Sequence, residues 1–265
     1  MNAKVTELFQ NIWNNYLEVT PSAKKIHQLL GSGNDVINDH VAYRTFNLKK
    51  VGLDKLAQHL LALGYKECGE YHFEAKKLYA KHFEHTDTTL PKVFISELLV
   101  EQLSPAAQTI IHNIVDSIDE SLVDNQRFLY SGKTWDISYA EYQTLLEESE
   151  YAAWLSAWGY RANHFTVSIN HLAHFESIDA VNSTVKAGGF CLNTTGGEVK
   201  GDQQVKLEQS STLADKAFVQ FSDQTVEIPS CFYEFAKRYP LASGELYSGF
   251  VATSADKIFE STNAA

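Results

Sequence analysis

The spacing of hydrophobic and polar positions changes several times along the chain, and each change predicts an element. Apolar residues recur at helical spacing over residues 5–17, and Thr20-Pro21 predicts an N-cap and first-turn proline for a second short helix. Residues 36–47 are rich in β-branched and aromatic side chains, which is typical of a strand. Residues 53–63 predict an amphipathic helix followed by a glycine, and residues 93–100 predict a further strand.

A later part of the chain repeats this order. Residues 161–170 resemble the first strand, and His164 lies 124 positions after His40. The helix that follows matches the earlier one at an offset of 125, so that Gly189 corresponds to Gly64. A strand, a helix ending in glycine and several short strands therefore occur twice, which predicts an internal duplication of βαβββ units.

The expected fold is α+β, with both units in one domain. Each unit is expected to end on a strand that carries an acid, Glu97 in the first and Glu234 in the second. The longer spacing from histidine to acid in the second unit is expected to be absorbed by the loop 193–202. The predicted segments are N-terminal helices (1–35), a first unit (36–103), a helical insert (104–160), and a second unit with the C-terminal segment (161–265).

Two such units folding into facing half-barrels would bring four polar side chains toward a common centre: His40, His164, Glu97 and Glu234. A buried histidine or carboxylate costs several kcal/mol unless it is paired or binds a metal ion. Two neutral imidazoles and one carboxylate form the facial set that suits Fe(II), with open positions for substrate and oxygen. A single histidine is more often a hydrogen-bonded core or surface group, and only the repeat position distinguishes His40 and His164.

The other histidines are weaker candidates. His171 and His174 have a possible ligand spacing but follow the strand in an expected turn, so they are the alternative ligands. His72, His82 and His85 lie in a charged segment and are expected to face solvent.

Arg44 shares a strand face with His40, because alternate residues of a strand point the same way. A guanidinium directed into a cavity needs an anion, which is either a substrate carboxylate or an internal acid such as Glu97. Near the C-terminus, residues 249–259 predict the end of a strand running into a helix. Thr253 or Ser254 is expected either to cap that helix or to lie close to a substrate carboxylate at its N-terminus.

Composition excludes several classes of function. The 265 residues carry a net charge of −11, which argues against general binding to nucleic acid or anionic lipid. No apolar run approaches a membrane span, and the first residues lack an apolar signal core. Three scattered cysteines are too few for a disulfide framework, so the expected protein is reduced and cytoplasmic.

Five stretches carry a resemblance to a known family. They are NDHVAYRTFN (38–47), VFISEL (93–98), ESEYAAWLSAWGYRANHFTVSIN (148–170), CFYEFAKRY (231–239) and SADKIFEST (254–262). Together they extend over nearly the whole chain, and in this order they resemble the 2-oxoadipate dioxygenase/decarboxylase family. The resemblance implies the vicinal oxygen chelate fold, whose paired βαβββ units agree with the repeat.

The resemblance also implies a chemistry and the residues that perform it. It implies one Fe(II) held by His40, His164 and Glu234, with Arg44 holding a substrate carboxylate. Thr253 and Ser254 align with a family pair near the substrate, where Thr253 replaces the more usual valine. The implied reaction, part of lysine breakdown, converts 2-oxoadipate and O2 to 2-hydroxyglutarate and CO2.

Two other readings of the same residues stay open. The first is a glyoxalase-type lyase, isomerase or hydrolase that depends on a divalent metal and uses Glu97 as a fourth ligand or a base. The second is a non-catalytic protein that binds a small ligand on the same paired units. The sequence gives no oligomeric state.

Overall fold

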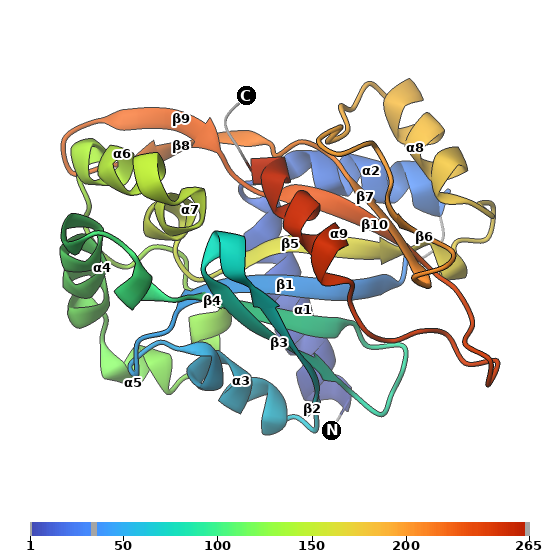
Figure 1. Cartoon of the computed structure of the whole chain (residues 1–265), viewed down its shortest axis with the longest axis horizontal. Coiled ribbons are helices and arrows are strands. Elements are labelled where there is room, and N and C mark those ends of the chain that lie inside the picture. The colour runs from blue at the N-terminus through green and yellow to red at the C-terminus, as the bar shows by residue number, and fades with distance from the viewer. Residues whose placement is uncertain (1, 33–35, 263–265) are drawn as a thin grey trace.

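The computed structural model describes residues 2–32 and 36–262. Eight of its strands form one curved sheet (Figure 1). These strands are β1 (Asn38–Phe46), β2 (Lys66–Phe73), β3 (Leu78–Glu84), β4 (Lys92–Leu98), β5 (Ala162–Ser168), β6 (Lys200–Asp202), β7 (Leu207–Ser211) and β10 (Phe232–Arg238). Their order across the sheet is β2-β3-β4-β1-β5-β10-β7-β6.

The sheet consists of two equivalent halves that meet at its centre. β1 and β5 pair antiparallel there, and each has a parallel neighbour on its other side, β4 or β10. In each half the first strand is followed by a helix, α3 (Leu53–Leu61) or α8 (Ile178–Ala187). Gly64 (φ 96°) and Gly189 (φ 86°) follow these helices in the left-handed region that favours glycine. The structure therefore confirms the duplicated βαβββ units and the vicinal oxygen chelate type of fold.

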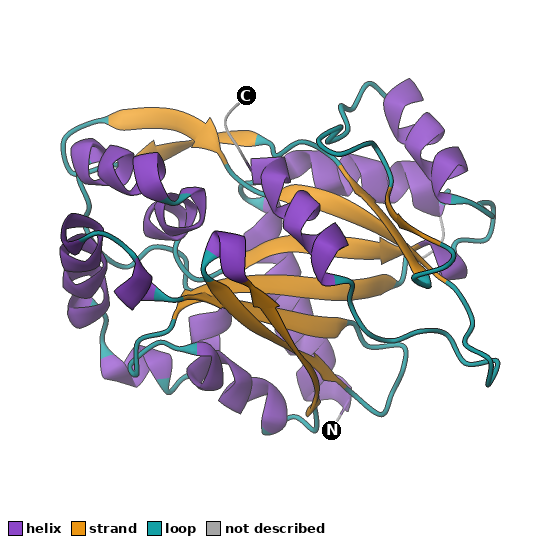
Figure 2. Ribbon diagram, viewed as in Figure 1, coloured by secondary structure: helices purple, strands orange, loops and turns teal. Residues whose placement is uncertain are grey.

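The helices lie in layers around this sheet. The remaining α-helices are α1 (Asn2–Leu17), α2 (Pro21–Gly31), α4 (Pro105–Ser117), α5 (Glu120–Val123), α6 (Tyr139–Glu148), α7 (Glu150–Trp158) and α9 (Ala252–Ile258). The short 3-10 helices are η1 (Glu74–Lys76), η2 (Val100–Gln102), η3 (Gln126–Tyr130), η4 (Ile169–His171) and η5 (Phe259–Thr262). Helices α1 and α2 cover one face of the sheet, the insert α4–α7 gathers at one end, and α9 crosses the opposite face (Figure 2).

The predicted helices bury the side chains that defined their pattern. Val5, Leu8, Ile12 and Tyr16 are all at most 2% exposed, so the apolar stripe of α1 is part of the core. No helix in the described ranges has the length and apolar character that crossing a membrane requires. Residues 33–35, where the predicted N-terminal segment ends, lie outside the described residues.

Two local predictions were wrong. The extra length of the second unit is not absorbed by the loop 193–202 alone, because a hairpin of β8 (Lys216–Gln220) and β9 (Thr225–Pro229) is inserted between β7 and β10. Helix α9 has Val251 at its N-cap and no side-chain cap, so neither Thr253 nor Ser254 caps it.

Candidate metal centre

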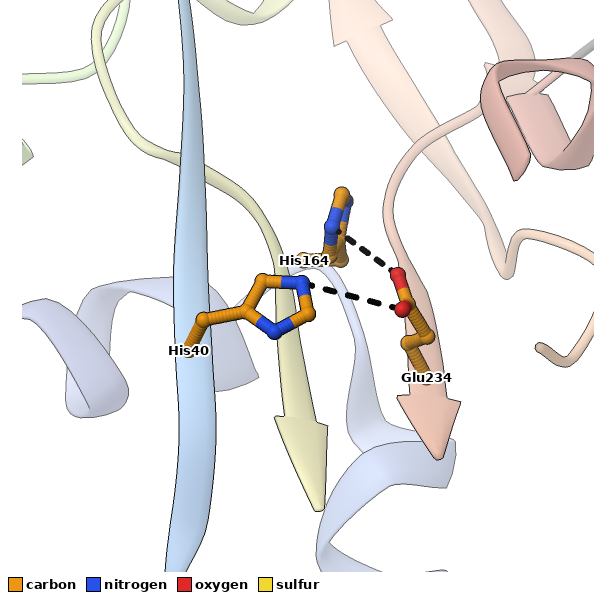
Figure 3. Close-up of side chains that lie close together, drawn as sticks. All are labelled: His40, His164 and Glu234. Carbon is orange, nitrogen blue, oxygen red and sulfur yellow. Dashed lines mark ion pairs between the residues drawn. The ribbon is translucent and has the colours of Figure 1, made fainter. Parts of the chain in front are cut away.

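Three side chains from three adjacent central strands meet on the face of the sheet that α9 covers (Figure 3). His40 comes from β1, His164 from β5 and Glu234 from β10. His164 Nε2 lies 3.1 Å from Glu234 Oε2, and His40 Nε2 lies 3.6 Å from Glu234 Oε1. All three residues are buried, and their ligand atoms lie within 4.8 Å of one another. The geometry is that of a group able to hold a metal ion.

Each histidine is oriented by the residue that precedes it. His40 Nδ1 lies 2.8 Å from Asp39 Oδ1, and His164 Nδ1 lies 2.9 Å from Asn163 Oδ1. A carboxylate can only accept, so the Nδ1 of His40 donates and its Nε2 carries a lone pair. The amide oxygen Oδ1 of Asn163 likewise can only accept, so the Nδ1 of His164 donates and its Nε2 faces Glu234. This arrangement, in which the ring nitrogen remote from the metal is hydrogen-bonded, is typical of histidine ligands.

The charges at the centre also suit a cation. Burial lowers the pKa of His164 below its ordinary value, so the ring is neutral at pH 7. Burial alone would raise the pKa of Glu234, but His40, His164 and a hydrogen bond from Gln209 bring it below its ordinary value. The pair of His164 and Glu234 therefore consists of a neutral imidazole and an ionised carboxylate.

One buried atom tests whether the residues fit a metal ion. Glu234 Oε1 accepts a hydrogen bond from Gln209 Nε2 at 2.6 Å, but Glu234 Oε2 is buried and accepts none within residues 2–32 and 36–262. The lone pair of His164 Nε2 faces this oxygen, and two lone pairs 3.1 Å apart repel unless a cation lies between them. The residues present therefore fit a divalent metal ion.

Strand register shows which residue of the first half corresponds to Glu234. Lys92 pairs with His40, and Phe232 pairs with His164, so Phe94 is the counterpart of Glu234. The prediction that Glu97 occupies this position was wrong. The fourth position, which could have carried a ligand, is therefore an apolar phenylalanine, and the described residues place three potential ligands at this centre.

Glu97 has a different role from those considered in the sequence. Its Oε2 accepts the backbone N–H of Leu53 at 2.8 Å, at the first residue of α3. It therefore stabilises a helix N-terminus. It pairs neither with Arg44 nor with either histidine of the centre.

The space above the centre is small and mostly apolar. A cavity of about 20 Å³, room for roughly one water molecule, touches all three residues and Gln209. Its other walls are Phe94, Phe250, Ala255, Ile258 and Phe259. Since Ala255 and Ile258 belong to α9, this helix closes the centre in the structure.

Phe259, which lines this cavity, also lies beside Arg44, whose Cζ is 5.9 Å from the centre of its ring. Its Nη1 donates to both carboxylate oxygens of Glu150, at 3.1 and 3.2 Å, and its Nη2 donates to Thr262 Oγ1 at 2.9 Å. The internal acid beside Arg44 is therefore Glu150. A second cavity of about 210 Å³, lined by both Glu150 and Phe259, lies next to this pair.

The other predicted residues lie farther from the cavity. Thr253 is exposed on α9, and Ser254 is buried beside Gly201. His171 Nδ1 lies 2.8 Å from Ser168 Oγ, and His174 is exposed, so the structure does not bring these two alternatives into the centre.

Comparison with known proteins identifies the family. The model of the 2-oxoadipate dioxygenase/decarboxylase family matches residues 2–245. This chain belongs to that family. A chloroplastic/amyloplastic 2-oxoadipate dioxygenase/decarboxylase of Oryza sativa subsp. japonica is 38% identical over 97% of this chain and 78% of its own length. The chain is thus similar to a family enzyme along almost all of its sequence.

Two solved structures share the fold closely. A Shewanella frigidimarina protein, provisionally described as a hydrolase, is 60% identical with a TM-score of 0.91, over 94% of this chain and 98% of that chain. The hydroxyglutarate synthase of Oryza sativa, solved in complex with 2-oxoadipate, is 36% identical with a TM-score of 0.91. That comparison covers 97% of this chain and 91% of the rice chain.

The sequence did not predict that several further residues lie around the candidate metal centre. Gln209 lies on the short strand β7, which has no distinct periodic pattern. Asp39 is held by Arg238, whose Nε and Nη2 donate to its two oxygens at 2.7 and 2.9 Å. His82, expected to face solvent, is 2% exposed, with its ring 5.3 Å from that of Phe250. The position of Asp39 directly before His40 was the one available signal.

Proposed function

We propose that this chain is a non-haem Fe(II) dioxygenase/decarboxylase, with His40, His164 and Glu234 as the metal ligands. The observation that carries the proposal is the buried two-histidine, one-carboxylate set with an unbonded Glu234 oxygen. This donor set suits Fe(II) with open positions for other ligands. The rice relative solved with 2-oxoadipate supports a 2-oxo diacid as substrate.

The proposed reaction takes one 2-oxo diacid and one O2 to CO2 and a 2-hydroxy diacid that is one carbon shorter. Bound Fe(II) would supply the redox chemistry of the step. The side chains of this chain would hold and orient the substrate. Arg44 would bind the distal carboxylate, while Phe94 and Phe250 keep water from the reacting atoms.

Thr253 and Ser254 remain candidates for the substrate site. They lie on α9, whose side chains close the cavity. A six-carbon diacid is much larger than a cavity of about 20 Å³, so α9 has to move before substrate enters.

The test is anaerobic loading with Fe(II), followed by measurement of oxygen uptake and CO2 release with 2-oxoadipate. We expect His164→Ala to lose bound iron and turnover together. The exposed His174→Ala is the matched control and should retain both. Absence of oxygen uptake with any 2-oxo diacid would overturn the proposal, and turnover under strict anaerobiosis with Zn(II) or Ni(II) would favour the glyoxalase-type reaction instead.

A further inference from the structure

The guanidinium of Arg44 is enclosed almost completely. The residue is 1% exposed. Its Cζ lies 4.8 Å from the ring centre of Tyr151, 5.0 Å from that of Trp154 and 5.9 Å from that of Phe259. In such surroundings each N–H without an acceptor costs free energy, so the positions of the acceptors show where the group could still bind an anion.

That distribution is uneven. Glu150 occupies Nη1 with both of its oxygens, and Thr262 occupies Nη2 with a neutral hydroxyl. Arg44 Nε is buried and has no acceptor among the residues that the structure describes. Nε and Nη2 form one edge of the planar group, and such an edge can bind a carboxylate with two parallel hydrogen bonds. The edge that suits a second carboxylate is therefore the incompletely satisfied one.

Thr262 belongs to the turn that closes the metal centre. It is the last residue of η5, and its hydroxyl also donates to the carbonyl oxygen of Phe259 at 3.1 Å. The Phe259 side chain lines the cavity above the metal ligands. One short turn thus covers both the carboxylate-binding edge of Arg44 and the metal centre.

Glu150 differs from Thr262 in its surroundings. Its side chain is 23% exposed, and it faces the end of the guanidinium rather than the Nε edge. It can stay in place and orient Arg44 while another anion binds at the free edge. Thr262 is placed differently, because its hydroxyl accepts from Nη2, one of the two nitrogens that a carboxylate at this edge would use.

We propose that Thr262 is a specificity-determining residue, whose hydroxyl stands in for one oxygen of the substrate's distal carboxylate at Arg44. A 2-oxo acid with a second carboxylate displaces it, because an anion bound to both Nε and Nη2 replaces one neutral acceptor. A 2-oxo acid without that carboxylate leaves the turn in place. The inference rests on the proposed function, since it takes Arg44 as the distal carboxylate site.

Thr262→Val tests this inference, because valine keeps the shape and removes the hydroxyl. Binding of 2-oxoadipate and of 2-oxohexanoate, which lacks the second carboxylate, is measured by calorimetry on the Fe(II)-loaded protein without oxygen. We expect Thr262→Val to bind 2-oxoadipate about tenfold more tightly, because the carboxylate no longer has to displace a hydrogen bond between the hydroxyl and the charged guanidinium. Binding of 2-oxohexanoate should not change.

Thr262→Ser is the matched control, because it retains the hydroxyl and should bind both acids as the unmodified chain does. Amide exchange provides a second measurement: 2-oxoadipate, but not 2-oxohexanoate, should speed exchange in residues 259–262. Unchanged or weaker 2-oxoadipate binding by Thr262→Val would overturn the inference, and so would an equal gain for both acids. If the proposed function is wrong, oxygen uptake will be absent in every variant. The binding measurements do not depend on oxygen uptake, so the two outcomes can be told apart.

Discussion

Replacing Asp39 with asparagine removes one negative charge from a buried network beside the metal centre. Asp39 Oδ1 accepts from His40 Nδ1 and from Arg238 Nη2, and its Oδ2 accepts from Arg238 Nε. The two side chains of the ion pair are only 5% and 4% exposed. Burial alone would raise the pKa of Asp39, but Arg238 and His40 bring it far below its usual range, so the carboxylate is ionised.

The magnitude follows from the charge that remains. Asparagine retains one acceptor oxygen but turns an NH2 group toward a donor, and Arg238 is left as a buried charge that has lost its ion-pair partner. Removing one member of a buried ion pair costs about 3 to 5 kcal/mol, and we expect the lower end because one oxygen survives. For a chain of 265 residues, about 3 kcal/mol lowers the melting temperature by about 5 °C.

The assay is thermal unfolding of the metal-free chain, so that metal binding does not add to the stability. Asp119→Asn is the matched control, because this exposed N-cap carboxylate can be replaced by an equally good capping amide, and it should not shift the transition. In the double variant Asp39→Asn, Arg238→Met, part of the loss should be recovered, because the unpaired charge is removed as well. If Asp39→Asn unfolds within 1 °C of the unmodified chain, the reasoning about the buried charge is refuted.

Three further predictions concern the centre and its surroundings. Phe94→Glu should add a carboxylate opposite Glu234, so that metal is retained but a 2-oxo acid no longer changes the absorption of the metal. A titration identical to that of the unmodified chain would contradict the assigned register. Glu97→Gln should lower the free energy of unfolding by about 1 kcal/mol through α3, with metal content unchanged, and loss of metal would place Glu97 at the centre after all. Adding Fe(II) anaerobically at 100 times its Kd to chelator-treated protein should stabilise it by about 2.7 kcal/mol in calorimetry, and should leave His164→Ala unchanged.

The internal repeat was the most informative part of the sequence. It placed His40 and His164 at equivalent positions, and the structure brings both to one point because β1 and β5 pair at the centre of the sheet. Glu234 was a candidate from its strand alone, and the family resemblance selected it. The sequence thus predicted the duplicated fold and the three residues that meet.

The counterpart of Glu234 could not be predicted in the same way. A linear pattern does not fix which residues of two strands lie opposite each other, since register depends on pairing and on the turns. The sequence therefore equated Glu97 with Glu234, whereas pairing with β1 gives that place to Phe94. His82 was misjudged for a related reason: it lies among charged residues in sequence, but Tyr71 and Phe250 cover it in space.

Arg238 connects the centre with the segment that closes it. Besides holding Asp39, its Nη1 donates to the backbone carbonyls of Tyr247 and Gly249, at 2.9 and 2.7 Å, just before Phe250 and α9. Arg238 is thus bonded both to the segment and, through Asp39, to His40. Metal binding and closure of the segment are thermodynamically reciprocal. The free energy by which bound metal stabilises the closed segment equals the free energy by which the closed segment stabilises the bound metal. If bound metal favours the closed segment, a chelator will remove the metal fastest from the protein while that segment is open.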